Sequence, residues 1–213
     1  MIRILVAMER EAESLGLPCE LIGIGGTALP RTSPDDILVN TGYCGGYKVP
    51  VGSVVEPCSA GDYRTGEAIP LARHFACRTY PCYTSDSFVT EPRNGEPAIY
   101  DMELWKIRRL PHRKLYCLKI VSDNLDEADC EAFDDCGAWN RVRELLRKEQ
   151  LTGEVEENGI HSGRIYSLHR YDGILTVSLA MAAKAGTHVA DQQEDEEQQR
   201  FIEEWMKKKH GPK

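Results

Sequence analysis

Short apolar runs separated by Gly, Pro and Asp constrain the fold of this chain more than any other feature of its sequence. The first run, residues 2–7, is nearly continuously apolar, as in a strand that is buried on both faces. Similar runs follow at residues 20–26, 36–40, 51–56 and 115–123. Helical patterns alternate with them at residues 9–16, 102–109 and 132–149. The mixture predicts an α/β layered fold around a central sheet, with ligands bound at the carboxyl ends of its strands.

The character of the sequence changes after Gln150. Residues 151–163 have a loop-like composition, residues 164–186 mix strand and helix signals, and residues 191–213 have the pattern of a polar terminal helix. We therefore expect one main domain at residues 1–150 and a C-terminal extension at residues 151–213 that packs on the domain or at a subunit interface.

Net charge and the lack of long apolar runs restrict the partners. The formal net charge is −8, whereas a protein that binds a phosphate backbone needs a basic stripe, so we expect no nucleic acid partner. The same charge argues against anionic membranes, and no apolar run is long enough to span a bilayer. The apolar segment at the N-terminus is too short for a signal peptide, which favours a cytoplasmic protein.

Cysteine and histidine spacing gives no sign of a metal centre. The eight cysteines include no Cys-x-x-Cys pair, and the six histidines include no His-x-x-x-His pair. We interpret the cysteines as reduced thiols. The sequence predicts neither a metal site nor another cofactor.

Three carboxylates follow the ends of predicted strands. Glu11 lies just past the first strand, Asp123 ends the run at 115–123, and Glu103 lies where an apolar segment passes into a helical pattern. Carboxylates at the carboxyl ends of buried strands project toward the crevice where ligands bind. A single one is usually a turn or cap residue, and Asp123 with Ser122 before it also fits that interpretation. The three together predict a crevice that carries several carboxylates.

Two glycine-rich segments, residues 23–26 and 40–46, each follow an apolar run. Glycine lets a backbone approach a ligand closely, but neither segment is a P-loop or a dinucleotide-binding fingerprint. Taken alone, each segment is more typical of a plain turn.

The order of these motifs is more specific than any one of them. The series ILVAMEREAE, IGIGG, VNTGYCGG, VPVGSVVE, TSDSFVT, IYDMEL and LKIVSD resembles the nucleoside phosphorylase and nucleosidase superfamily, and is most similar to the methylthioadenosine/S-adenosylhomocysteine nucleosidases. The resemblance covers about residues 2–149 and implies that residues 1–150 form a catalytic domain. It implies a three-layer nucleoside phosphorylase-like fold with a central mixed sheet flanked by helices. The fold would be trimmed near the N-terminus and followed by an extra C-terminal segment.

The resemblance also implies roles for individual residues. Glu11 matches the base that activates water, Glu103 the residue that holds the ribose hydroxyls, and Asp123 the acid that protonates the departing purine at N7. The other matched positions bind the substrate: Met102 at the sugar, Phe88 stacked on the base, Val89 at the base edge, and Gly42 and Ser122 lining the site. Cleavage of an N-glycosidic bond develops charge on both the sugar and the base, so acids near each of them act where charge changes.

Two positions depart from the family pattern. The family usually has Ser-Ala where this chain has Tyr43-Cys44, and the bulky Tyr43 is expected either to narrow the pocket or to supply a hydroxyl in place of the serine. Lys119 stands where the nucleosidases carry an arginine, and lysine keeps the charge but loses the planar fork. Tyr43 and Lys119 are nevertheless expected to contact the substrate.

The leading expectation is a nucleosidase that hydrolyses the N-glycosidic bond of an adenine-type purine nucleoside to free base and sugar. A phosphate-dependent phosphorylase remains an alternative, because Arg31 and Arg64 lie near the matched motifs. A nucleoside- or nucleotide-binding module without turnover is a further alternative, because of Tyr43 and the shortened segment after Glu11. The resemblance implies that the protein is a homodimer and that it binds a small-molecule purine nucleoside.

Overall fold

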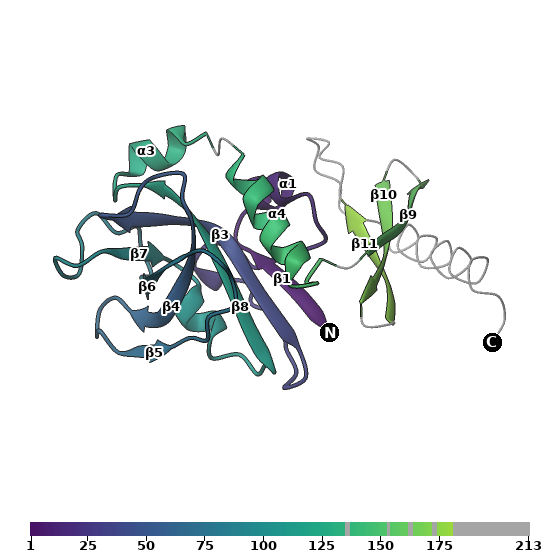
Figure 1. Cartoon of the computed structure of the whole chain (residues 1–213), viewed down its shortest axis with the longest axis horizontal. Helices are drawn as coiled ribbons and strands as arrows, with labels where there is room; N and C mark the ends of the chain where they lie inside the picture. Colours follow the sequence, from purple (N-terminus) through teal and green to yellow (C-terminus); the bar gives the residue numbers. More distant parts are fainter. Residues whose placement is uncertain (135–136, 153, 162–163, 172–173, 181–213) are drawn as a thin grey trace. The chain divides into compact units, whose positions relative to one another are not determined.

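The computed structural model describes residues 1–134, 137–152, 154–161, 164–171 and 174–180 (Figure 1). The chain divides into two compact units, Met1–Gly153 and Glu154–Lys213, and each is described by itself. Seven of the eight cysteines belong to the described residues, and none of those seven forms a disulfide.

The first unit is built on an eight-stranded mixed sheet. Its strands are β1 Ile2–Val6, β2 Glu20–Leu21, β3 Ile37–Tyr47, β4 Val54–Asp62, β5 Ala68–Pro70, β6 Arg78–Thr84, β7 Ala98–Asp101 and β8 Lys114–Asp123. Its helices are α1 Glu9–Leu15, α2 Leu104–Ile107, α3 Glu127–Ala132 and α4 Ala138–Lys148, with the short 3₁₀-helix η1 at Ile24–Gly26.

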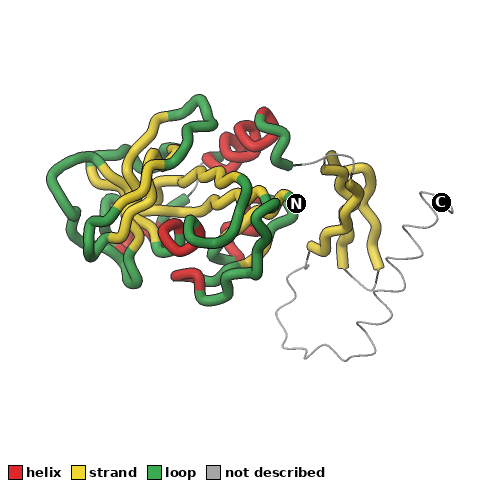
Figure 2. Tube along the Cα trace, turned by 90° about the horizontal axis from the view of Figure 1, so that it is seen from below, coloured by secondary structure: helices red, strands yellow, loops and turns green. Residues whose placement is uncertain are grey.

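The sheet curls on itself around β3, its longest strand. The strand order is β2-β1-β3-β7-β6-β4-β5, and β8 pairs with both β3 and β4. Strands β3, β8, β4, β6 and β7 therefore form a closed circuit of hydrogen-bonded neighbours, and Figure 2 shows the strands crossing tightly in this region. The β3–β8 pairing is parallel and runs from Ile37 opposite Lys114 to Gly45 opposite Asp123. This register brings the glycine-rich end of β3 beside the acidic end of β8.

Helices cover both faces of the sheet. One core cluster joins α1 and α4 to alternate residues of β1, β3 and β8, including Ile4, Val39 and Leu118. A second cluster on the other face joins α2 to the intervening residues, such as Leu5 and Leu38. Strand side chains alternate between faces, so apolar residues at consecutive positions feed both cores. The expected three-layer α/β arrangement is confirmed, and Figure 1 shows α1 beside α4.

Several elements differ in extent from the sequence expectation. The strand expected at residues 36–40 continues to Tyr47, so the glycine-rich segment 40–46 is not a turn but lies inside β3. The helix expected at 102–109 is the single turn α2, and the pattern at 132–149 begins as α4 only at Ala138. Positions 45 and 46 of the strand leave no room for a Cβ atom, because side-chain atoms of Asp123 and Val121 of β8 lie within 3 Å of where it would be. Glycine fits there because it has no side chain.

The second unit contains an antiparallel sheet of β9 Glu154–His161, β10 Arg164–Tyr171 and β11 Ile174–Ala180, in the order β11-β10-β9. The loop expected at residues 151–163 is wrong for residues 154–161, which pair with β10. The Glu, Asn and Gly residues of β9 are unfavourable for a strand, but β9 is an edge strand, where charged residues are common. The terminal helix expected at 191–213 lies outside the described residues.

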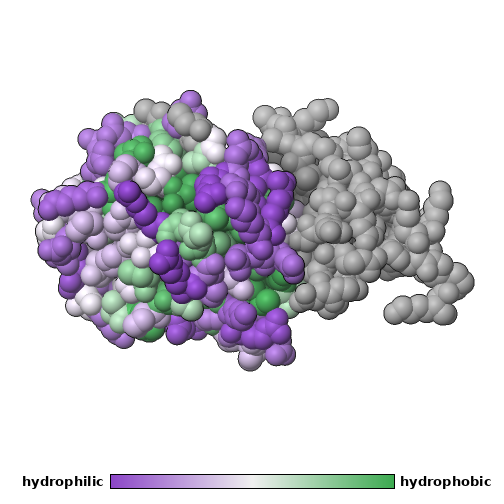
Figure 3. Space-filling view, in the orientation of Figure 1, coloured by the Kyte–Doolittle hydropathy of each residue, from purple (hydrophilic) through white to green (hydrophobic). Residues whose placement is uncertain are grey.

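The visible surface of the first unit is largely hydrophilic, with separate hydrophobic patches between polar side chains (Figure 3). The large apolar side chains exposed among the described residues are Met1, Leu21, Ile24 and Val51. No helix in the described part of the chain has the length and apolar character that crossing a membrane requires.

Candidate active site

Glu11 lies in the first turn of α1 and is buried, with 2% of its surface exposed. Its Oε2 accepts hydrogen bonds from the backbone N–H groups of Ala7 (2.8 Å) and Met8 (3.0 Å), at the start of its own helix. Its Oε1 accepts from the N–H of Tyr43 at 2.7 Å, which ties α1 to β3. Burial raises the pKa of Glu11, while the three amides and the charge of Lys119 oppose the shift.

Gly42 is required by this arrangement. A Cβ atom on Gly42 would lie 2.5 Å from Oε1 of Glu11, closer than any unbonded contact permits. The glycine expected to line the substrate site therefore lines the Glu11 carboxylate, and β3 can approach α1 only because position 42 has no side chain.

Lys119 forms the centre of a buried charge cluster. Its side chain, on β8, is 1% exposed, and its Nζ lies 2.8 Å from Oδ2 of Asp101 and 4.0 Å from Oε2 of Glu103. These carboxylates raise the pKa of Lys119 well above its usual value in spite of burial, so the lysine is charged. Lys119 therefore neutralises carboxylates from β7 and the start of α2.

Asp101, the last residue of β7, is buried, and its Oδ2 accepts a hydrogen bond from the N–H of Leu104 at 3.0 Å, at the start of α2. It also accepts a hydrogen bond from the hydroxyl of Thr84 at 2.6 Å. Lys119 lies inside the apolar run 115–123, and a buried lysine needs a buried acid as its partner. This requirement could have indicated from the sequence that a nearby acid such as Asp101 is buried.

Glu103 is buried beside this ion pair and reaches across to the η1 segment. Its Oε1 accepts from the N–H of Gly25 at 2.8 Å. Burial raises the pKa of Glu103 to about 7, with Asp101 and Glu11 adding to the shift and Lys119 opposing it. Glu103 therefore shares one electrostatic environment with Glu11, Asp101 and Lys119.

Asp123 ends β8 and is 1% exposed. Its Oδ2 accepts from the hydroxyl of Ser122 at 2.8 Å, and its Oδ1 accepts from the N–H of Leu125 at 2.8 Å. A Cβ on Gly45 would lie 2.9 Å from Oδ1, so this carboxylate rests against the backbone of β3. Ser122 and Leu125 thus fix the orientation of the Asp123 carboxyl group.

A cavity of about 40 Å³ brings together three of the residues expected to bind the substrate. Phe88 and Val89, from the segment between β6 and β7, face Met102 across it. Gly45, Leu125 and Asp101 also line the cavity, so it opens beside the charge cluster. Sequence reasoning did not identify Gly45 or Leu125, and no local motif in the sequence marks Leu125.

Tyr43 does not take the place expected for its hydroxyl. The hydroxyl accepts a hydrogen bond from Nε1 of Trp139 at 2.9 Å, and the ring packs edge-on against Phe133 and Trp139. The side chain belongs to the core beneath α4 and does not line the 40 Å³ cavity. Tyr43 contacts the site through its backbone N–H, which donates to Glu11.

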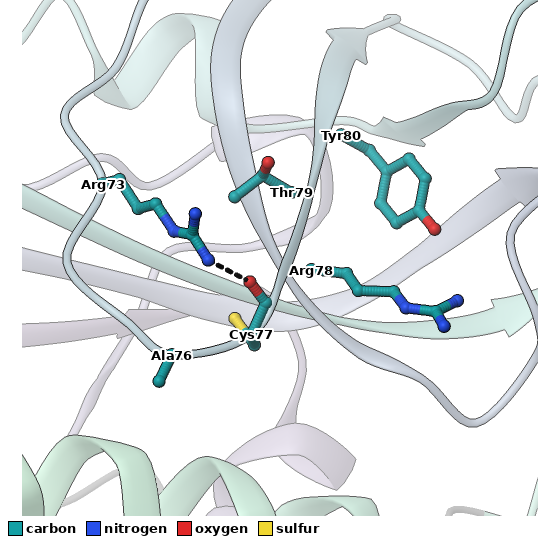
Figure 4. Close-up of a pocket in the computed structure, with 6 residues that line it drawn as sticks. All are labelled: Arg73, Ala76, Cys77, Arg78, Thr79 and Tyr80. Carbon is teal, nitrogen blue, oxygen red and sulfur yellow. Dashed lines mark hydrogen bonds between the residues drawn. The ribbon is translucent and has the colours of Figure 1, made fainter.

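A larger cavity, of about 650 Å³, lies at the opposite end of β6 and contains none of the expected site residues. Arg73 and Arg78 line it, but they extend to opposite sides of the start of β6 (Figure 4). Arg73 donates to the carbonyl of Cys77 at 3.0 Å, whereas Arg78 has no hydrogen-bond or ion-pair partner among the described residues. Because the guanidinium groups do not converge, we place the candidate site at the smaller cavity and its carboxylates.

Comparison with known proteins gives matches by structure and not by sequence. No protein-family model matches the chain, and no curated protein matches it. A methylthioadenosine nucleosidase variant from Chlamydia trachomatis, bound to MTA, superposes with a TM-score of 0.57 at 14% identity, over 70% of this chain and 98% of that chain. The enzyme from the same organism bound to adenine gives 0.56 at 13% identity, over 70% and 97%.

A third structure comes from Colwellia psychrerythraea 34H. This 5′-methylthioadenosine/S-adenosylhomocysteine nucleosidase, in complex with adenine, gives a TM-score of 0.51 at 14% identity, over 70% of this chain and 94% of that chain. At such identities the likeness is one of fold. The chain has the nucleoside phosphorylase-like fold that the order of its motifs predicted.

Proposed function

We propose that this chain is a nucleosidase that hydrolyses the N-glycosidic bond of an adenine-type purine nucleoside, such as methylthioadenosine or adenosylhomocysteine. The observation that carries the proposal is that Glu11 and Asp123 rest against Gly42 and Gly45 of β3, beside a cavity lined by Gly45, Phe88 and Met102. Glu103 shares the electrostatic environment of Glu11 and Lys119. The fold shared with nucleosidases that bind MTA or adenine supports it.

The proposed reaction divides its proton transfers between two carboxyl groups. Asp123 donates a proton to N7 of the purine as the bond between C1′ and N9 breaks, so the base leaves as a neutral molecule. Water attacks C1′ and gives a proton to Glu11, whose raised pKa suits a general base. The division resembles that between the two carboxylates of glycosidases.

Glu103 and Met102 would hold the sugar in this scheme. Oε1 of Glu103 is held by Gly25, and Oε2 faces Lys119 at 4.0 Å, so a second acceptor site remains for ribose hydroxyls. Met102 lines the cavity beside it and offers a polarizable apolar surface. Lys119 would act through Glu103, because its positive charge keeps a fraction of the Glu103 carboxyl groups ionised.

The charge of the site favours water over phosphate as the nucleophile. Glu11, Asp101 and Glu103 surround a single buried cation, Lys119, which is already paired with Asp101. A phosphate dianion would need charge-assisted donors that this cluster does not offer. Arg31 and Arg64 are exposed, and neither lines the cavity.

A second candidate is a nucleoside-binding module without turnover. Its support is the internal use of the carboxylates, because Glu11 accepts three backbone amides and Glu103 accepts one. Such a module would bind nucleosides without releasing the base, and replacing Asp123 by Asn would not change its affinity.

The deciding experiment incubates the purified chain with methylthioadenosine, adenosylhomocysteine, adenosine, inosine and adenosine monophosphate, with and without phosphate. We expect chromatography to detect free base from at least one of them in the absence of phosphate. Release that strictly requires phosphate would identify a phosphorylase, and tight binding without release would identify the binding module.

Matched variants separate catalysis from burial. We expect Asp123→Asn and Glu11→Gln each to lower kcat by about 100-fold or more, as loss of a general acid or base does. Glu56→Gln is the control, since Glu56 is 1% exposed and its carboxylate also accepts two backbone amides, from His74 and Phe75. Equal losses in all three variants would argue that the effect is structural.

A further inference from the structure

The base cavity is too small for the ligand that the proposed function requires. Its volume of about 40 Å³ has room for no more than a few water molecules, because about 10–15 Å³ of such space holds one. Sites for nucleoside-sized ligands usually enclose about 300 Å³ or more. Some side chain that lines the cavity must therefore move before a purine ring can enter.

Leu125 is the side chain best situated to fill that space. It is 7% exposed and packs in a small cluster with Val89, Ala98 and Tyr100, against the cavity wall. Its Cδ2 lies 2.9 Å from the position that a Cβ would take on Gly45, which also lines the cavity. The leucine side chain therefore reaches from the segment after β8 to the backbone of β3.

The backbone of Leu125 has a separate task. Its N–H donates to Oδ1 of Asp123 at 2.8 Å. Its φ is 69°, in the left-handed region that a leucine rarely adopts and that glycine adopts at no steric cost. The Asp123 contact thus needs this backbone conformation but does not need a leucine side chain.

We propose that the Leu125 side chain fills the base subsite, so that a purine binds only when this side chain is displaced. The inference rests on the proposed function. Displacement removes a buried leucine from its cluster, and the free energy that this costs weakens the binding of every base. A smaller side chain at position 125 gives the space to the ligand without removing the amide that holds Asp123.

The test measures adenine binding to the full chain by calorimetry for the native protein, Leu125→Ala and Leu125→Gly. We expect each variant to bind adenine about tenfold more tightly or better, because burial of a leucine is worth about that factor in an equilibrium constant. Leu125→Gly guards against a folding defect in Leu125→Ala, since glycine also relieves the positive φ.

Leu151→Ala is the matched control, because Leu151 is a buried leucine in the α4 core cluster and away from the cavity. It should leave adenine affinity unchanged. Native protein that binds adenine at least as well as both Leu125 variants would overturn the role of Leu125 and leave the proposed function intact. If neither the native protein nor the variants bind adenine, and no nucleoside is cleaved, the inference and the proposed function both fall.

Discussion

At the scale of single residues, the buried carboxylates differ in how the protein satisfies them. Glu11 accepts three backbone amides, whereas Glu103 accepts one and lies beside two other acids. Amide donors stabilise a carboxylate in place, and neighbouring acids disfavour its charge. Burial raises the pKa of both groups, and it brings the pKa of Glu103 to about 7.

Replacement of Glu103 by Gln should alter the pH dependence of stability. Burial raises the pKa of Glu103 from its ordinary 4.5 to about 7 in the folded chain, so the folded state binds more protons between these values. Its contribution is therefore complete below pH 4.5 and is lost as pH rises through about 7. Urea titrations should give a flatter dependence of the free energy of unfolding for Glu103→Gln over this range.

Glu144→Gln is the contrasting variant. Its exposed carboxylate pairs with Arg141 and Lys148, and the bond to Lys148 is the main cause that lowers its pKa to about 2. Its contribution is present above pH 4.5 and is lost on acidification toward about 2, so the slope between 4.5 and 7 should match the native protein. An unchanged slope in Glu103→Gln would contradict the assignment.

Gly42→Ala should damage the site at its narrowest contact. The added Cβ would lie 2.5 Å from Oε1 of Glu11, so α1 or β3 must shift. We expect a loss of about 1–3 kcal/mol in unfolding free energy together with reduced turnover. Gly95→Ala is the control, because nothing lies within 4 Å of a Cβ there. Equal stability of the two variants in denaturant titration would count against the contact.

At the scale of elements, β8 organises the site. Its parallel pairing with β3 aligns Gly45 with Asp123, and Lys119 in the same strand holds the end of β7 through Asp101. Asp101 in turn caps α2, the helix that begins next to Glu103. A single buried ion pair therefore links two strands and a helix start.

Lys119→Met should be strongly destabilising, because it leaves Asp101 and Glu103 buried without a cation. Removing one partner of a buried pair typically costs about 3–5 kcal/mol, and thermal unfolding would detect such a loss readily. Lys148→Met removes an exposed lysine paired with Glu144 and should cost less than about 1 kcal/mol. Similar melting temperatures for the two variants would show that the buried pair does not carry this stability.

At the scale of the whole molecule, the first unit holds its own core. Three hydrophobic clusters lie within Met1–Gly153, among the residues whose burial the structure describes. The closed circuit of strands and the candidate site are also complete within that range. The extension after it contributes a separate antiparallel sheet.

A chain that ends at Gly153 should therefore fold. We expect its circular dichroism spectrum to be that of an α/β protein. If the extension packs on the domain or at a subunit interface, as the sequence predicts, its removal lowers the melting temperature or changes a dimer to a monomer, and an unchanged melting temperature and oligomeric state would contradict that prediction. Light scattering on both chains would also test the proposed homodimer.

Local sequence pattern predicted several of the elements, and it predicted that Glu11 and Asp123 follow or end strands. Apolar runs predicted β1 and β8, and Gly16 predicted the end of α1. The same local reasoning was wrong about residues 40–46 and residues 154–161, where strand pairing outweighs an unfavourable composition. Ordered motifs also predicted the fold that the structural comparisons confirm.

Tertiary structure alone decided how those residues are used. The orientation of Tyr43 depends on Trp139, the state of Glu103 depends on Gly25 and Lys119, and Leu125 lines the 40 Å³ cavity. These partners are distant in the chain or carry no motif, so no local pattern could indicate them. Sequence determined which chemical groups reach the carboxyl end of the sheet, whereas packing determined which are already paired and how much space remains between them, because burial and pairing depend on contacts between remote segments.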